Sequence, residues 1–352
     1  MFTRTFSAAI LAASMVTAAA AQDRSDWPKE MTIGTASQGG TYFVYGNGFA
    51  GFVSEALGLG ATGEVTGGPV QNVTLVQTGD HLMGLVTMGP AYDAWIGKSE
   101  LAPGLEHTDI RALFPMYQTP FQVIALKSSG ITSVSDLAGK RVSVGPAGGT
   151  PGTYWPQFMA ALGIEATISN AGAADAAGQL SDGLIDAFAF AAGVPIAAFA
   201  ELAAQREVVM FGFSEDERAR VLAAYPAMAP LTIPAGTYAG HDYDQQTVAL
   251  WNFAIAHKDM PETLAYEITR LALDNPDRMK QIHAAAKETL VENWDKNTFM
   301  PFHPGAVRYL AETGIPVPDA LKGRPRARPS GVRKGAGRAR IPTGRKRRGA
   351  RS

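Results

Sequence analysis

The chain has 352 residues and no cysteine, which excludes disulfides, thiolate metal sites and cysteine nucleophiles. Thirteen of its 31 basic residues follow Leu321, where no acidic residue occurs. The body over 22–321 keeps 17 basic residues against all 32 acidic ones, a net charge of −15. An acidic body lacks the basic surface that nucleic-acid binding requires, so we expect no nucleic-acid partner.

The first 21 residues have the pattern of a secretory signal peptide. Arg4 supplies a positive start, an uncharged apolar stretch follows over 6–20, and three alanines precede Gln22. The alternative is a membrane anchor, for which the stretch is short. We therefore expect export to the periplasm with cleavage after Ala21.

The next part of the body alternates strand-like and helix-like segments. Its apolar runs and its three-to-four-residue periodicities separate cleanly at glycines and prolines. The predicted strands are 31–35, 61–66 and 82–88, and the predicted helices are 42–56, 70–78 and 90–96. A longer apolar run over 110–126 is interrupted by Pro115 and Pro120, which predicts a broken element.

The same alternation resumes after that run. The predicted strands are 141–144, 166–169, 185–191, 208–213 and 247–256, and the predicted helices are 151–162, 173–182, 195–205, 215–224, 261–273, 276–288 and 306–312. Ser214 and Glu217 form a capping box at the start of 215–224. Repeated strand–helix units imply α/β architecture with parallel sheets, and ligands bind beyond the carboxyl ends of such strands.

Two glycine-rich loops each join a predicted strand to a predicted helix, over 33–42 and 144–154. Such loops let the backbone approach a ligand, and the helix that follows presents free N–H groups to an anion. The first loop resembles a nucleotide-binding loop, but Gly40 stands at the lysine position, and neither loop reads G-x-G-x-x-G. A small anion such as a carboxylate remains as the ligand. The alternative is two ordinary strand-to-helix turns.

An ordered series of short stretches covers most of the body, over 33–42, 66–72, 91–94, 131–145, 233–238 and 303–306. This series resembles the solute receptors of TRAP transporters, specifically the TAXI family. The resemblance implies a two-lobed, type II-like periplasmic binding protein fold with a mainly parallel sheet in each lobe. It implies that the first lobe comprises 22–119 and 233–321, the second 120–232, with hinges near 119–121 and 231–234. It further implies a monomer that delivers a small organic acid or amino acid, of the glutamate or 2-oxo acid kind, to TRAP membrane subunits.

By this resemblance, the ligand lies on the first loop and is also held by Asn72 and the second loop. The strand–helix pattern independently predicts that three further turns after strands, over 66–68, 87–90 and 191–195, converge with both loops on one cleft. The candidate ligand-binding residues are Ser37, Gln38, Gly40, Thr41, Tyr42, Asn72, Thr87, Thr150, Thr153 and Gly193. Tyr42 and Phe121 are the candidate aromatic contacts. The six histidines are scattered, so we expect no metal site. We expect no cofactor and no catalytic residue.

Two other functions stay open at this point. A periplasmic enzyme acting on small carboxylates would use the same cleft, and an adhesin or surface antigen would need none. The segment 322–352 is rich in Arg, Gly and Pro and is expected to be disordered. It is either an arm for nucleic acid or anionic membrane, or an appended segment without a role in the fold, which we favour.

Overall fold

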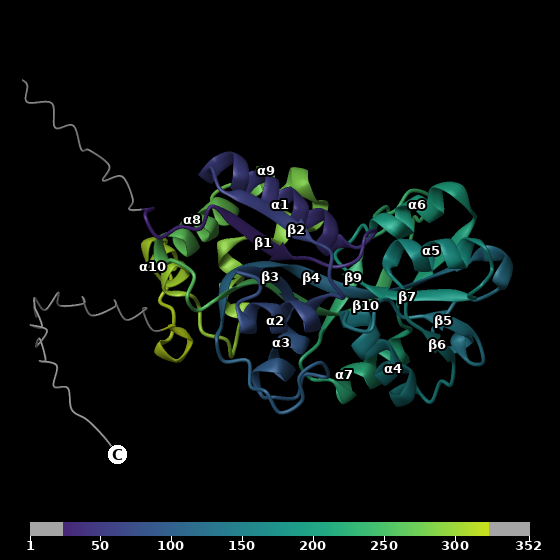
Figure 1. Cartoon of the computed structure of the whole chain (residues 1–352). Helices are drawn as coiled ribbons and strands as arrows, with labels where there is room; N and C mark the ends of the chain where they lie inside the picture. Colours follow the sequence, from purple (N-terminus) through teal and green to yellow (C-terminus); the bar gives the residue numbers. More distant parts are fainter. Residues whose placement is uncertain (1–23, 324–352) are drawn as a thin grey trace, which may run out of the picture.

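The computed structural model describes residues 24–323, and the predicted signal peptide and nearly all of the basic segment lie outside them. The chain forms two lobes side by side, joined by a shared ten-stranded sheet (Figure 1). The strand order is β2-β1-β3-β10-β4-β7-β5-β6, with β8 paired to β4 and β9 to β10. No helix between residues 24 and 323 has the length and apolarity that a membrane span requires.

The first lobe is built on three parallel strands. They are β1 (Glu30–Gly34), β2 (Gly60–Glu64) and β3 (Met83–Thr87), connected by α1 (Thr41–Leu57) and α2 (Pro69–Thr78) and followed by α3 (Met88–Trp95). The C-terminal helices α8 (Glu262–Leu273), α9 (Pro276–Ile282) and α10 (Pro304–Glu312) complete this lobe. In Figure 1, α1 and α9 lie on one face of its sheet and α2 and α3 on the other. One hydrophobic core links these elements.

The second lobe repeats the arrangement with three more parallel strands. They are β5 (Arg141–Ser143), β6 (Thr167–Ser169) and β7 (Ala187–Ala191), with β8 (Val208–Phe211) added at the edge of β4. Its helices are α4 (Thr150–Leu162), α5 (Ala173–Ser181), α6 (Ala197–Gln205) and α7 (Glu215–Ala224). The helix α7 has the predicted bounds, and both hydrogen bonds of the Ser214–Glu217 capping box are present.

Two long antiparallel strands, β4 (Ile110–Leu126) and β10 (Gln245–His257), run through both lobes. The prediction that prolines break the 110–126 run is therefore wrong. The ladder between the two strands shifts register between Trp251 and Phe253, and Phe253 pairs with Pro115. A proline fits a strand at such an irregularity, where its missing N–H is not needed.

The two lobes have separate cores, and the boundary between them crosses both long strands. On β4 the core residues change between Tyr117 and Phe121, the segment in which we predict the first hinge. On β10 they change between Leu250 and Phe253. The packing thus places the second crossing later than the predicted 231–234, and Leu250 belongs to the second lobe. The segment 229–233 is itself an unpredicted strand, β9 (Ala229–Ile233), paired with β10.

The predicted helix 276–288 is interrupted. The helix α9 ends at Ile282, and a short 3-10 helix follows over Ala284–Glu288. Between them His283 is extended, with φ −157° and ψ 138°, and its side chain accepts a hydrogen bond from the Ala285 N–H. This side-chain cap replaces the helical hydrogen bond and restarts the chain in a new direction.

Candidate functional site

A pocket lies where the two lobes meet, and it contains about 400 Å³ of space that protein atoms leave unfilled, part of it open to solvent. The first lobe lines it with the β1–α1 loop, the start of α2 and the end of β3. The second lobe adds the β5–α4 loop and the end of β7, and β4 contributes Thr119 at the crossing. The strands of each lobe therefore direct their carboxyl ends to one place, as in other α/β folds.

Three helices begin at this pocket. The N-cap residues of α1, α2 and α4 are Gly40, Gly68 and Gly149, and none of them makes a side-chain capping hydrogen bond. The first N–H groups of a helix have no partner within the helix, and they carry a partial positive charge. The glycine caps of α1 and α4 offer no side-chain acceptor to these groups, whereas at α2 Pro69 has no N–H and the Val70 N–H donates to the Gly148 carbonyl. The pocket is therefore suited to a small anion.

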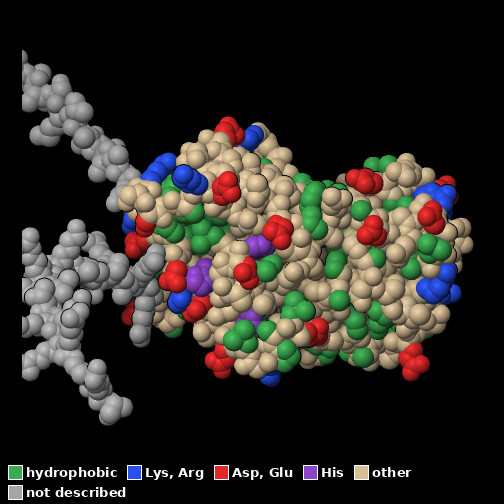
Figure 2. All heavy atoms as spheres, viewed as in Figure 1, with side chains coloured by type: hydrophobic (Ala, Val, Ile, Leu, Met, Phe, Trp, Pro, Cys, Tyr) green, Lys and Arg blue, Asp and Glu red, His purple; other side chains and the backbone are tan. Residues whose placement is uncertain are grey.

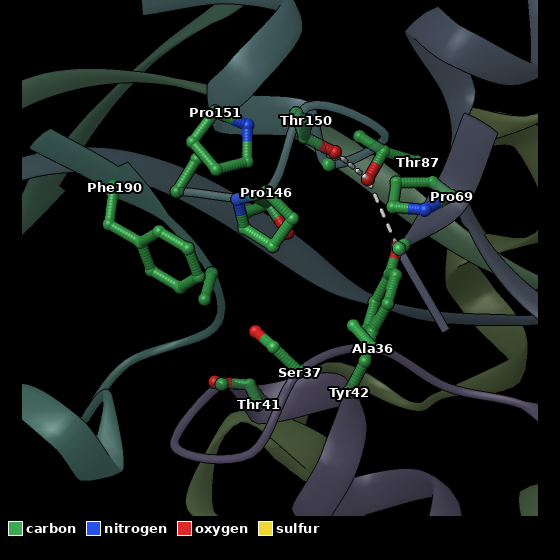
Figure 3. Close-up of a pocket in the computed structure, with 17 residues that line it drawn as sticks. Ala36, Ser37, Thr41, Tyr42, Pro69, Thr87, Pro146, Thr150, Pro151 and Phe190 are labelled. Atoms are coloured by element: carbon green, nitrogen blue, oxygen red, sulfur yellow. Dashed lines mark hydrogen bonds between the residues drawn. The ribbon is translucent and has the colours of Figure 1, made fainter. Parts of the chain in front are cut away.

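A chain of hydrogen bonds behind the pocket joins the two lobes to the crossing strands. The Tyr42 and Thr87 hydroxyls both reach Asn252 Oδ1, at 2.6 and 2.9 Å. The Thr87 hydroxyl also lies 2.7 Å from the Thr150 hydroxyl, a link between the first and second lobes (Figure 3). Asn252 in turn donates to the Thr119 hydroxyl at 2.6 Å. The buried Asn252 on β10 therefore orients three pocket hydroxyls.

None of the described residues that line the pocket carries a charge. The hydroxyl of Tyr42 stays protonated because burial raises its pKa above the ordinary value, against the opposing effect of its hydrogen bond to Thr87. Arg111 and Arg141, near the starts of β4 and β5, do not line the pocket. Arg141 pairs with Asp186 at 2.6 Å, and Arg111 donates to backbone carbonyls in its own strand region. Figure 2 shows few charged side chains where the lobes meet on the face drawn.

The first glycine loop crosses to the second lobe and caps two of its helices. Three of its oxygens each accept a backbone N–H at 3.1 Å: Ser37 Oγ from Ala173, the Gln38 carbonyl from Ala174, and the Gly39 carbonyl from Ala198. Ala173 and Ala174 open α5, and Ala198 lies in the first turn of α6. The loop thereby satisfies N–H groups that the second lobe cannot satisfy itself.

The second loop makes the reciprocal contact at the start of α2. The Val70 N–H donates to the Gly148 carbonyl at 3.1 Å. Gly68 beside it has φ 112°, a conformation that favours glycine, and a Cβ there would lie 3.0 Å from the same carbonyl oxygen. The lobes are therefore closed on each other, with backbone against backbone at both glycine loops.

The structure brings six of the ten predicted site residues to the pocket. They are Ser37, Gly40, Thr41, Tyr42, Thr87 and Thr150. Figure 3 shows Ser37 and Thr41 on one side of the space and Thr87 and Thr150 on the other. The remaining four, Gln38, Asn72, Thr153 and Gly193, do not line it.

Two of these four support the backbone instead. Asn72 is buried, and both ends of its side-chain amide are hydrogen-bonded. Oδ1 accepts from Thr66, and Nδ2 donates to the carbonyls of Gly34, Thr35 and Leu85. Gln38 exposes its side chain and contributes only its carbonyl to α5. Both positions therefore shape the cleft without facing it.

The other two lie just beyond the lining. Thr153 stands one turn into α4, and its buried Oγ1 has no hydrogen-bond partner among residues 24–323. The Gly193 carbonyl accepts the Thr41 hydroxyl, and a Cβ at Gly193 would meet the Tyr117 ring at 2.6 Å. Gly193 is thus a close contact between the lobes rather than a ligand contact.

Sequence reasoning missed the aromatic wall of the pocket. Phe190, near the end of β7, faces the space together with Pro146 and Pro151 (Figure 3). The predicted aromatic contact, Phe121, is instead fully buried in the second-lobe core. In the sequence, Phe190 resembles a core residue because it is apolar and lies in a buried strand. Its position next to the carboxyl end of that strand is the feature that could have identified it as a pocket residue.

Within residues 24–323, no group of three or more His, Asp or Glu side chains is arranged to hold a metal ion. His303 forms a hydrogen bond at a helix entry: its Nδ1 accepts the Gly305 N–H at the start of α10.

Several solved structures share this architecture at low sequence identity. Rpa4515 of R. palustris, solved with adipate, is 16% identical, with 73% of this chain and 88% of that chain covered at a TM-score of 0.50. MatC (Rpa3494) from Rhodopseudomonas palustris, solved with bound malate, is 15% identical, with 82% and 97% covered at 0.53. The periplasmic binding protein BugD is 14% identical, with 82% and 99% covered at 0.51.

These similarities establish the two-lobed, type II periplasmic binding protein fold that was predicted. A family model described as the NMT1-like family matches residues 33–314, from the end of β1 to just beyond α10. The match includes both glycine loops, both crossing strands and every element that lines the pocket. Because it covers most of the chain, this protein belongs to the NMT1-like family.

Proposed function

We propose that this protein is an extracytoplasmic solute receptor that closes its two lobes around a small organic acid. The observation that carries the proposal is the meeting of three glycine-capped helix N-termini in an uncharged pocket between the lobes. A carboxylate placed there accepts backbone N–H groups from α1 and α4. Ser37 Oγ, which accepts from Ala173, retains its own proton for the ligand.

The magnitudes favour local binding over long-range repulsion. Hydrogen bonds to a charged group contribute about 1.5–3 kcal/mol each, and a helix N-terminus adds about 0.3–1 kcal/mol. The net charge of −15 on the body repels an anionic ligand, but salt screens this repulsion within about 10 Å. Two solved proteins of this fold were crystallised with adipate and malate, both carboxylic acids, which supports the same ligand class.

The finer assignment rests on the ordered sequence stretches that resemble the TAXI receptors. We propose that the protein is exported to the periplasm, acts as a monomer and hands its ligand to the membrane subunits of a TRAP-type transporter. The signal peptide on which export depends lies outside the described residues.

Binding without catalysis fits the pocket better than an enzyme acting on small carboxylates. General acid–base chemistry needs a side chain that titrates near the working pH. Among the described lining residues the titratable side chain is Tyr42, whose pKa burial raises further from neutrality. We therefore assign no catalytic residue.

Native mass spectrometry of the purified mature protein, before and after denaturation, tests this function by identifying any acid carried from the host. Isothermal titration calorimetry with organic acids and amino acids then measures affinity. The expected result is one acid bound per chain without turnover. Consumption of the acid would indicate the enzyme, and the absence of binding or thermal shift with every acid would contradict the receptor.

A further inference from the structure

Resting on the proposed function, we infer that the cleft selects a monocarboxylate with an apolar body, and that it discriminates against dicarboxylates and zwitterionic amino acids. Of the ligands predicted from the sequence, this inference excludes glutamate and other amino acids and keeps the acids with a single carboxylate. It also separates this chain from the two similar proteins solved with dicarboxylates, adipate and malate.

The positive charge around the pocket suits one carboxylate. Each helix N-terminus is equivalent to about half an elementary charge, and those of α1, α2 and α4 converge on the space from the two lobes. No described lining residue is Lys, Arg or His, so a second carboxylate has no cation to pair with.

The hydroxyls of the pocket are already committed to one another. Tyr42 and Thr87 both donate to Asn252 Oδ1, which leaves Thr150 to donate to Thr87. A hydroxyl has a single proton to donate, so these three hydroxyls supply no donor for a second carboxylate without breaking the network. Thr119, which accepts from Asn252, is the member of the network whose proton stays available. The Ser37 hydroxyl accepts the Ala173 N–H and keeps its proton, and Figure 3 shows its oxygen directed into the pocket.

Part of the pocket wall is apolar. Phe190, Pro146 and Pro151 face the space, and Ala191 and Ala192 extend the wall along the end of β7. A carboxylate or ammonium placed against this wall loses its hydration without gaining a partner. An alkyl body buries apolar surface there and is favoured.

An ammonium group also has no counter-charge in the lining. The acid to consider is Asp175, in the first turn of α5, which is exposed and does not line the pocket. It lies at the rim near Ser37: a Cβ on Gly172 would be 3.3 Å from both Asp175 Oδ2 and Ser37 Cβ. An amino acid bound through Asp175 is therefore the specific alternative.

The test is calorimetry with compounds of equal carbon number that differ in their charged groups, over chains of about three to six carbons, which are small beside the drug-sized ligands of typical pockets. The four-carbon set is butyrate, succinate, 4-aminobutyrate and butyramide. We expect the best monocarboxylate to bind about 100-fold more tightly than the dicarboxylate, the amino acid and the amide of equal length, which is about 2.7 kcal/mol. Asp175→Asn should leave this order unchanged.

The outcomes separate the inference from the proposed function. A dicarboxylate that binds as tightly as its monocarboxylate overturns the selectivity and leaves the receptor function in place. So does an amino acid whose affinity falls in Asp175→Asn. An amide that binds as well as the acid shows that charge is not recognised. If no acid binds and native mass spectrometry finds none, the proposed function fails together with the inference.

Discussion

The two glycine loops look alike in sequence and act differently in the structure. The first loop reaches across the interface with three oxygen acceptors and caps α5 and α6 of the other lobe. The second loop offers a single backbone carbonyl, that of Gly148, to the opposite lobe, and its following threonine joins the hydroxyl chain. The first loop therefore couples lobe closure to the pocket, and the second mainly forms its wall.

A second contrast shows what closure adds. Ser214 caps α7 inside one lobe, through the Glu217 N–H, whereas Ser37 caps α5 from the other lobe, through the Ala173 N–H. The same type of hydrogen bond therefore stabilises a single lobe in one case and the closed pair of lobes in the other. Binding measurements distinguish these two roles, since only the second changes with closure.

The largest expected effect is on the stability of the lobe that carries the first loop. Burial lowers the pKa of His303 to about 4, from 6.5. The unfolded chain takes up this proton first, so stability falls as the pH drops from about 6.5 to about 4, by roughly 3 kcal/mol in total. Urea unfolding across this pH range, followed by fluorescence, measures the loss.

His303→Asn is the matched control, since asparagine can cap α10 but does not titrate. Its unfolding free energy should depend less steeply on pH, with a remaining slope from His283, whose pKa burial also lowers. Ligand affinity near neutral pH should be the same in both proteins. An unchanged slope in His303→Asn would mean that other groups govern the acid response.

Filling the pocket at the first loop should abolish binding most effectively. A Cβ on Gly40 would lie 3.3 Å from the Ser37 carbonyl and 3.7 Å from the Phe190 ring, so Gly40→Val occupies the space of the ligand. We expect an affinity loss of about 100-fold or more, from overpacking and lost N–H access. Gly51→Val in the same helix is the control, because a Cβ there meets nothing within 4 Å. Equal affinities in the two variants would exclude the first loop as the binding site.

Substitutions at Thr150 and Thr153 on α4 distinguish a ligand in the pocket from a ligand that lies deeper along the helix. Thr150→Val removes the hydroxyl that contacts Thr87, and we expect about 10-fold weaker binding, measured by calorimetry. Thr153→Val removes a buried hydroxyl that has no partner in the described part of the chain, so it should leave affinity unchanged and stability equal or slightly higher. If Thr153 proves the more sensitive position, the ligand lies deeper along α4 than the pocket.

The smallest expected effect is the loss of one cap across the interface. Ser37→Ala removes the acceptor for the Ala173 N–H, at a cost of about 1 kcal/mol to the closed state, so the loss of the cap alone weakens binding by about 5-fold. The loss of the hydroxyl that we propose donates to the ligand weakens binding further. Ser214→Ala should cost similar stability without changing affinity, because its cap lies within one lobe. Thermal melting and calorimetry on both variants provide the comparison. A similar affinity loss in both would show that closure does not depend on the first loop.

Local patterns were sufficient for most of the fold. Helical periodicity and caps placed α1, α2, α4 and α7 within a residue or two, because capping groups and turn glycines act over a few positions in the chain. The glycine loops also indicated where ligand-facing backbone would lie, and six predicted side chains do line the pocket. These are properties that neighbouring residues determine among themselves.

Tertiary structure decided which polar side chains face the ligand and which support the backbone. Asn72 and Thr150 are both buried polar residues near helix starts. The Asn72 side chain donates hydrogen bonds to three carbonyls of the first lobe, whereas the Thr150 hydroxyl contacts the Thr87 hydroxyl across the interface. Asn252 and Phe190 reach the site from β10 and β7, and the pairing of both strands with β4 joins residues that lie far apart in the sequence. Sequence determined the loops that close around the pocket. The long-range pairing of β4 with β10 decided what they close upon, because only that pairing brings the two lobes face to face.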